Sequence, residues 1–252
     1  MIDKLKIINS DIVYKKEDKY LFDSFLNELG IDKSYEMLTN YQRVSEEKKV
    51  DLNMLLAFLG YEYSLSSILY TILRGQEDCV KAFLCNAFHG YPVSIESRPS
   101  NYSKTKYYFK IPVKNGKYLD IRTFNYTEGP VDYYDAVKTM DFGDVNLIMS
   151  HLDKNILLKF SKNPNIIKEL DQTRKIRNYV YHHNLLYSFE KEDLEYGIAF
   201  IIKNLPFPEL KKDYINEINN LRYQGAIRDF DIGEKIAIYL NDDLQKLIFQ
   251  KR

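Results

Sequence analysis

Residues 106–126 read KYYFKIPVKNGKYLDIRTFNY, and they hold the clearest change of pattern in the chain. Two runs rich in aromatic and β-branched residues flank Asn115-Gly116, the strongest short-range signal for a β-hairpin. Pro112 lacks the N–H group that a central strand donates, so the first run is predicted to be an edge strand. We therefore expect a small β-hairpin at about residues 105–126, inserted in a chain of another class.

Helical patterns lie on both sides of this hairpin. Residues 64–87 place apolar side chains at helical spacing, with a polar break at residues 74–78. Nearer the N-terminus, a shorter apolar face ends at Gly30, which is predicted to be a helix C-cap. After the hairpin, the periodicity predicts helices at 131–139, 143–151, 153–160, 164–187, 191–204, 208–222 and 231–249.

The predicted fold is mainly α, with one small β-hairpin insertion. We expect an N-terminal helical region at residues 1–59 and a helical core at residues 60–190 that carries the hairpin. Additional C-terminal helices at residues 191–252 are expected to pack on that core.

Composition bounds the class of protein. The chain has 252 residues, 36 basic and 36 acidic side chains, and 45% hydrophobic residues, which suffice for a packed core and exclude a disordered chain. We find no secretory signal and no apolar run long enough for a bilayer, so we expect a soluble, cytoplasmic protein without a membrane partner. Zero net charge argues against a charge-driven nucleic-acid coat, although it leaves room for a local basic site.

Familiar catalytic and cofactor signatures are absent from the sequence. It has no P-loop, no dinucleotide-binding glycine pattern, no nucleophile elbow and no HExxH zinc pattern. The two cysteines do not have zinc-ligand spacing, nor do the four histidines. We therefore expect neither a metal ion nor a cofactor.

Unusual polar residues concentrate in LDQTRKIRNYVYHHNLLYS, residues 170–188. On a helix with about 100° per residue, five of them share one face of about 140°: Arg174, Arg177, Asn178, Tyr181 and His182. His183 falls on the opposite, apolar side, which favours a hydrogen-bonded structural histidine. The helix therefore presents two guanidinium groups, an amide, a phenol and an imidazole together.

The string IRNYVYHHN, residues 176–184, resembles the RxxxxH motif of HEPN-domain ribonucleases, and in particular the bacterial abortive-infection proteins of the AbiD/AbiF type. Two further segments resemble parts of that family: MDFGDVNLIMSHL at 140–152 and YSLSSILYTILRGQEDCVKAFL at 63–84. In the second segment, Ser64 or Ser66 stands where the family usually has an aspartate. The resemblance covers about residues 55–190.

This resemblance implies a HEPN-like helical bundle of four or five helices, a homodimer, and metal-independent cleavage of RNA. It also implies a role in phage defence or as the toxin of a toxin–antitoxin pair, with an antitoxin protein or a noncoding RNA as a possible regulator. Toxins of this kind that are silenced by a nucleotidyltransferase often carry a tyrosine two residues after the motif histidine. Asn184 occupies that position here, which argues against that mode of control.

The residue types suit this chemistry. The histidine side chain is a type of group that enzymes use as general acid or base near neutral pH, so His182 is a candidate for that role, and Arg177 can bind phosphate oxygens and stabilise their developing charge. Asn178, one turn before His182, can orient the imidazole or donate to phosphate. Arg174, Tyr181 and His183 are candidate substrate-binding residues.

Two questions stay open at this level. The same basic face would also serve a non-catalytic module that binds RNA or protein, and a purely structural helical adaptor is a third alternative. Glu77, in the polar break of an apolar helix, is a candidate partner for a motif arginine, and an exposed, solvated Glu77 is the alternative.

Overall fold

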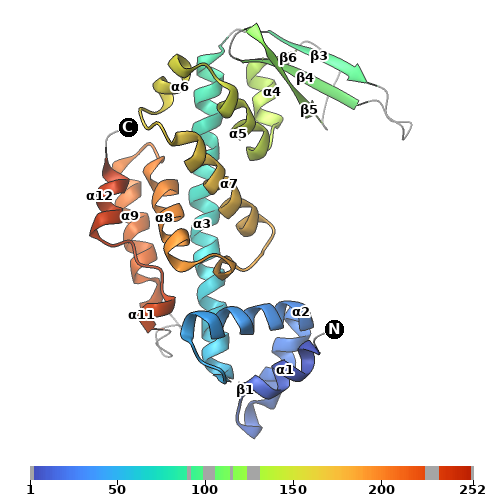
Figure 1. Ribbon diagram of the computed structural model, residues 1–252, viewed down its shortest axis with the longest axis vertical. Helices are drawn as coiled ribbons and strands as arrows, with labels where there is room; N and C mark the ends of the chain where they lie inside the picture. Colours follow the sequence, from blue (N-terminus) through green and yellow to red (C-terminus); the bar gives the residue numbers. More distant parts are fainter. Residues whose placement is uncertain are drawn as a thin grey trace. The chain divides into compact units, whose positions relative to one another are not determined.

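The computed structural model describes residues 3–89, 92–98, 106–113, 116–123, 131–224 and 233–250. The chain divides into two compact units. Unit 1 comprises residues 1–72, 176–203 and 207–249, and unit 2 comprises residues 73–175 with the short pieces 204–206 and 250–252. Helices α3 (Leu52–Ala87) and α7 (Ile166–Tyr181) contribute to both units (Figure 1). The three expected regions do not follow this division, because the N-terminal and C-terminal regions both belong to unit 1.

Unit 1 is helical apart from a short parallel strand pair. The pair joins β1 (Ile12–Val13) to β2 (Val50–Asp51). Its other elements, besides parts of α3 and α7, are α1 (Lys4–Asp11), η1 (Lys16–Asp18), α2 (Lys19–Ser45), η3 (Leu186–Ser188), α8 (Lys191–Lys203), α9 (Pro208–Asn220), η4 (Leu221–Tyr223), α11 (Gly233–Ile236) and α12 (Asp242–Phe249). Helices α8, α9 and α12 pack side by side (Figure 1).

Aromatic rings form part of the core of unit 1. Phe58 of α3 packs edge-on against Tyr41 of α2, at a centroid distance of 5.4 Å, and against Tyr187 of η3, at 5.0 Å. Tyr61, one helical turn after Phe58, accepts a hydrogen bond from the N–H of Ile238, at 2.8 Å. The core therefore ties together segments from both ends of the chain and the segment that follows α7.

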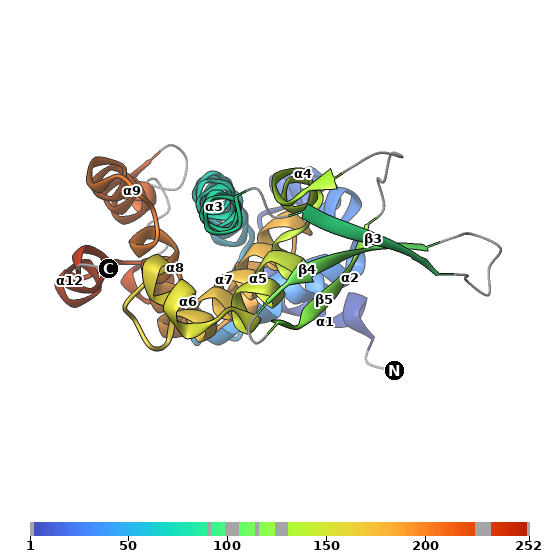
Figure 2. The same ribbon diagram turned by 90° about the horizontal axis from the view of Figure 1, so that it is seen from above.

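Unit 2 consists of an antiparallel sheet and helices that pack on it. The sheet has the order β5-β4-β3-β6, with β3 (Pro92–Arg98), β4 (Lys106–Pro112), β5 (Tyr118–Thr123) and β6 (Val131–Asp132). Figure 2 shows β3, β4 and β5 side by side. The helices are α4 (Tyr133–Thr139), α5 (Phe142–His151) and α6 (Lys154–Phe160), together with parts of α3 and α7.

The predicted hairpin is present as β4 and β5. The N–H of Val113 donates to the carbonyl of Lys117, at 2.9 Å, and this bond closes the connection between the strands. Gly116 has a φ of +66°, in the left-handed region that glycine adopts without strain. Asn115, the other half of the predicted turn, lies outside the described residues.

The prediction that the first run forms an edge strand is wrong, because β4 lies between β5 and β3. The pairing of β3 with β4 ends at Ser94 opposite Lys110, two residues before Pro112. The missing N–H of Pro112 therefore removes no hydrogen bond to β3. The strands β3 and β6 extend the predicted hairpin to a sheet of four strands, in a chain that is mainly helical.

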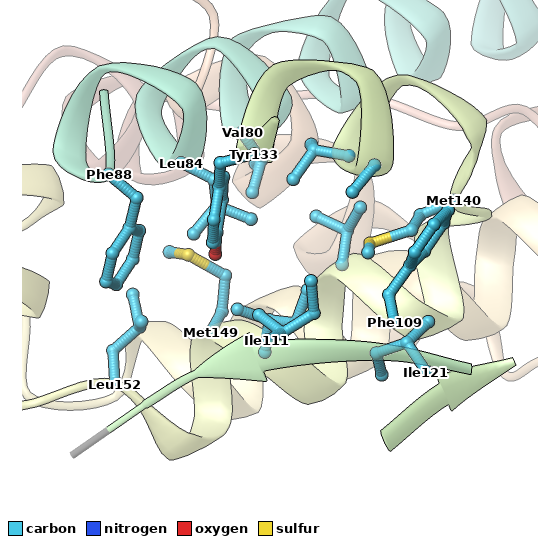
Figure 3. Close-up of a cluster of buried hydrophobic side chains, with 14 of the residues drawn as sticks. Val80, Leu84, Phe88, Phe109, Ile111, Ile121, Tyr133, Met140, Met149 and Leu152 are labelled. Atoms are coloured by element: carbon cyan, nitrogen blue, oxygen red, sulfur yellow. The ribbon is translucent and has the colours of Figure 1, made fainter. Parts of the chain in front are cut away.

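A hydrophobic core joins the sheet to the helices of unit 2 (Figure 3). Phe109 of β4 lies opposite Ile121 of β5 in register, and both side chains are buried. Phe88, in the turn after α3, stacks on Tyr133 of α4 with a centroid distance of 4.6 Å. The sheet thus buries one face under the helices, as alternating strand residues allow.

Five of the seven helices predicted after the hairpin are found with bounds within two residues of those predicted. The helix predicted at 231–249 is interrupted between α11 and α12. There, the side chain of Asn219 bonds both the N–H and the carbonyl of Leu240, at 2.8 and 3.1 Å. Because a side chain satisfies these backbone groups, the buried segment does not need to be helical.

Two longer helices also differ from the predictions. Gly30 has a φ of +75° and a ψ of 160°, so the helical conformation is broken there as predicted, but a second helical stretch follows directly and runs to Ser45. Helix α3 begins at Leu52, well before residue 64. Within the described residues, α3 is the one helix long and apolar enough to span a membrane, and half of that apolar stretch is buried, as in a core helix.

Candidate functional site

The motif lies at the C-terminal end of α7, which ends at Tyr181 and does not continue to residue 187 as predicted. His183 has a φ of +53°, in the left-handed region. The N–H of His183 donates to the carbonyl of Val180, at 3.3 Å, and the N–H of Asn184 donates to the carbonyl of Tyr179, at 2.9 Å. This pair of bonds around a left-handed residue is the Schellman motif, which ends a helix.

This turn changes the positions of the two histidines. The His182 N–H still bonds the carbonyl of Asn178, at 3.1 Å, so His182 is the first residue beyond the helix. Both His182 and His183 are exposed. The expectation that His183 lies on the apolar side is therefore wrong, because the helical angle no longer applies after the left-handed turn.

Two charged side chains of unit 1 hold the segment that follows the helix. The ammonium group of Lys33 donates to the carbonyl of His183, at 3.0 Å. The carboxylate of Glu62 accepts hydrogen bonds from the N–H groups of Leu186 and Tyr187, at 3.0 and 2.9 Å. These contacts span more than 120 residues of sequence, and they fix the path of the chain directly after the two histidines.

Glu62 is 2% exposed, and burial raises the pKa of its carboxyl group to about 7, although its two backbone hydrogen bonds oppose that rise. Burial disfavours the charged form, whereas an N–H donor favours it. The group that anchors the turn therefore titrates near neutral pH.

Arg177 and Tyr181 lie one helical turn apart and contact each other. The guanidinium carbon of Arg177 lies 4.1 Å from the centroid of the Tyr181 ring, and both side chains are half-buried. The Tyr181 ring also stacks on Tyr70 of α3, with a centroid distance of 4.7 Å and an interplanar angle of 29°. Asn178, also half-buried, occupies the same last turn of the helix.

Arg174 belongs to unit 2, whereas the other four residues of the predicted polar face belong to unit 1. Its guanidinium group donates to Oδ1 of Asp171 from Nε, at 3.1 Å, and from a terminal nitrogen, at 2.8 Å. This ion pair lowers the pKa of the Asp171 carboxyl group. Both residues line a cavity in unit 2 of about 440 Å³, together with Gly143, Asn146, Leu147, Ser150 and Ile167.

Glu77 is not an exposed, solvated residue. Its side chain is 14% exposed and forms an ion pair of 2.9 Å with Lys81, one helical turn later. Its suggested role as partner of a motif arginine stays a prediction.

Sequence reasoning missed three residues next to the motif: Lys33, Glu62 and Tyr70. Each comes from a segment distant in sequence, and each contacts α7 or the turn after it. Glu62 could have been singled out from the sequence, because it lies among the apolar residues of a long helix. A carboxylate that is buried in such a helix requires hydrogen-bond donors.

Comparison of the chain with protein-family models, with curated proteins and with solved structures finds no match. Among the described residues, no group of three or more histidine, cysteine, aspartate or glutamate side chains is arranged to hold a metal ion.

Proposed function

We propose that this protein is a metal-independent endoribonuclease with His182 and Arg177 as its main catalytic residues. The observation that carries the proposal is the end of α7, where an exposed histidine directly follows a helical turn that contains an arginine and an amide. Because this imidazole is exposed, a phosphodiester group of an RNA in solution can reach it. The mainly helical chain and the string IRNYVYHHN also support a relationship to HEPN ribonucleases of the AbiD/AbiF type.

The reaction that suits these groups is attack by the ribose 2′-OH on the adjacent phosphorus. A neutral imidazole takes the 2′-OH proton, the new bond from O2′ to phosphorus forms, and the bond from phosphorus to O5′ breaks. The leaving O5′ takes a proton from a second acid. The products are a 2′,3′-cyclic phosphate and a 5′-OH, and the guanidinium group of Arg177 neutralises the charge that develops on the phosphate oxygens.

The experiment compares RNA cleavage by the wild-type chain, His182→Ala and Arg177→Ala, with and without EDTA. We expect each substitution to lower the cleavage rate by at least about 100-fold, and we expect EDTA to have no effect. His89→Ala is the matched control, because His89 is also an exposed histidine in a turn directly after a helix. Circular dichroism checks that every variant keeps its helical content.

The outcomes distinguish an enzyme from a non-catalytic module that binds RNA. A chain that binds RNA through Arg177 without cleaving it would be the non-catalytic binding module. Cleavage that survives His182→Ala, or that needs a metal ion, would contradict the proposed mechanism.

The proposed cellular role is that of an effector in phage defence or of the toxin of a toxin–antitoxin pair. Expression in a bacterial host tests it by following growth and the integrity of total RNA. We expect the wild-type chain to slow growth and degrade RNA, and His182→Ala to do neither.

A further inference from the structure

Three side chains of unit 1 form a continuous stack next to the candidate catalytic histidine. We call Arg177, Tyr181 and Tyr70 the Tyr70 stack. The Arg177 guanidinium carbon lies 4.1 Å from the centroid of the Tyr181 ring, and Tyr70 lies 4.7 Å from that same centroid. Two groups at these distances cannot share one face of a ring, so Tyr181 lies between Arg177 and Tyr70. The order of the stack is therefore guanidinium, phenol, phenol.

Tyr70 is the exposed end of this stack. It is 45% exposed, whereas Tyr181 is half-buried. Within the described residues, Tyr70 has no ring or hydrogen-bond contact other than that with Tyr181. A large aromatic ring is thus held at a defined angle by its contact with Tyr181, and nearly half of its surface is exposed to solvent.

We propose that Tyr70 is a stacking subsite for an unpaired nucleobase of the RNA substrate. This inference rests on the proposed function, since it places the base beside the phosphate that Arg177 would bind. Every nucleobase has a π-face, and aromatic side chains next to cationic groups are the usual platform for single-stranded nucleic acid. A base inside a duplex has both faces covered by its neighbours, so the subsite selects single-stranded RNA.

A second aromatic residue with a cation continues this surface along α3. Tyr63 lies seven residues before Tyr70, which is two helical turns and about 10.5 Å along the same face. Tyr63 is 49% exposed, and the ammonium group of Lys33 lies 5.9 Å from its ring centroid. Because Lys33 also bonds the carbonyl of His183, Tyr63 is connected to the motif turn through one side chain. Three rings and two cations from α2, α3 and α7 are thus connected to the motif helix and its turn, and this combination of groups is typical of surfaces that bind single-stranded nucleic acid.

The test measures binding of the full chain to a short single-stranded oligonucleotide of 2′-O-methyl RNA, which lacks the attacking hydroxyl group and stays intact. One base is 2-aminopurine, whose fluorescence falls when it stacks, and its position is moved along the strand. We expect Tyr70→Ala to weaken binding by about tenfold or more and to abolish the fluorescence change at one position, whereas Tyr70→Phe retains both. Tyr196→Ala is the matched control, because Tyr196 in α8 is also 45% exposed.

Tyr70→Leu is a control for loss of the packing on Tyr181, because leucine keeps apolar contact with Tyr181 and cannot stack on a base. We expect Tyr70→Leu to behave like Tyr70→Ala. Equal affinity of Tyr70→Ala, Tyr196→Ala and the wild-type chain, while Arg177→Ala binds less tightly, would overturn the stacking subsite and leave the proposed function standing. Equal affinity of the wild-type chain for duplex RNA and for single-stranded RNA would also overturn the stacking subsite. Absence of RNA binding by the wild-type chain would overturn both proposals.

Discussion

The carboxyl group of Glu62 is buried in unit 1 and holds the backbone just after the candidate site. Its pKa is about 7 in the folded chain, against 4.5 for an unperturbed glutamate. Between these pH values the folded chain keeps a proton that the unfolded chain releases. The free energy of unfolding therefore decreases as the pH rises through this window, and the full loss is present above pH 7.

We predict a pH-dependent difference in stability between the wild-type chain and Glu62→Gln. Relative to this variant, the wild-type chain should lose on the order of 3 kcal/mol between pH 4.5 and pH 7. Urea unfolding followed by circular dichroism at several pH values measures the difference. A constant difference across that range would contradict the raised pKa.

His183 occupies the left-handed position of the turn, where glycine is the usual residue. We predict that His183→Gly unfolds with a free energy about 1 kcal/mol higher than that of His183→Ala, because alanine retains the steric cost of this conformation. Urea unfolding of the two variants makes the comparison. Equal stability would mean that the turn relaxes to another conformation.

The same two variants test the role of His183 in RNA cleavage. If both retain wild-type activity, His183 is neither a substrate-binding residue nor the second proton carrier. If both lose activity while folded, His183 supplies the second proton-transfer group within one chain.

At the residue scale, the sequence predicted the helical turn that carries Arg177 and Asn178, because helical periodicity is a local property. It did not predict where that helix ends, since residues 182–184 contain no glycine or proline. The contacts that hold the chain directly after it come from Lys33 and Glu62, more than 120 residues away. Such contacts require the tertiary structure.

At the scale of elements, two glycines in long helices should respond to alanine in opposite directions. Gly30 has a φ of +75° and a ψ of 160°, a conformation essentially confined to glycine, whereas Gly60 lies in the regular part of α3. A methyl group at either position would meet no atom within 4 Å, so backbone conformation decides the effect.

We predict that Gly30→Ala lowers the free energy of unfolding by about 1–3 kcal/mol, and that Gly60→Ala raises it by about 0.5–1 kcal/mol. Thermal unfolding of both variants beside the wild-type chain is the measurement. A stabilising effect of Gly30→Ala would show that α2 can run through residue 30 without a break.

The elements themselves were partly predictable. Helices with strong apolar periodicity were found near their expected bounds, and the Asn-Gly pair marked the hairpin that the structure contains. Strand β3, PVSIESR, was missed because its weak alternation gives no clear strand signal, and β6 has two residues. The break between α11 and α12 depends on Asn219, in another helix, and no local pattern announces it.

At the scale of the whole molecule, the proposed reaction needs two proton-transfer groups, and a homodimer with paired α7 helices would supply one from each chain. We predict a dimer by light scattering, with specific activity that falls on dilution. A mixture of Arg177→Ala and His182→Ala chains should regain part of the activity through hybrid dimers, if the two residues act across the interface. A strictly monomeric chain with undiminished specific activity would contradict this prediction.

Division into two units was not predictable, because the grouping of residues 1–72 with residues 176–203 and 207–249 depends on distant contacts. Arg43 illustrates them: it forms an ion pair of 2.6 Å with Glu190 and donates to the carbonyls of Tyr187 and Phe189. Composition and periodicity describe each segment by itself and carry no information on such pairs.

The discontinuity of unit 1 has a consequence for the order in which the protein is made. Residues 1–72 of unit 1 emerge from the ribosome first, then residues 73–175, which are the main part of unit 2, and only then residues 176–203 and 207–249 of unit 1. Residues 1–72 therefore cannot complete the packing of unit 1 until these later residues emerge, whereas most of unit 2 is by then available to fold. His182 and Arg177 belong to the late segment, whose turn needs Lys33 and Glu62 from the early one. A nascent chain thus carries no assembled candidate site until residues 182–187 have emerged from the ribosome, and we expect a product that ends before them to leave RNA intact.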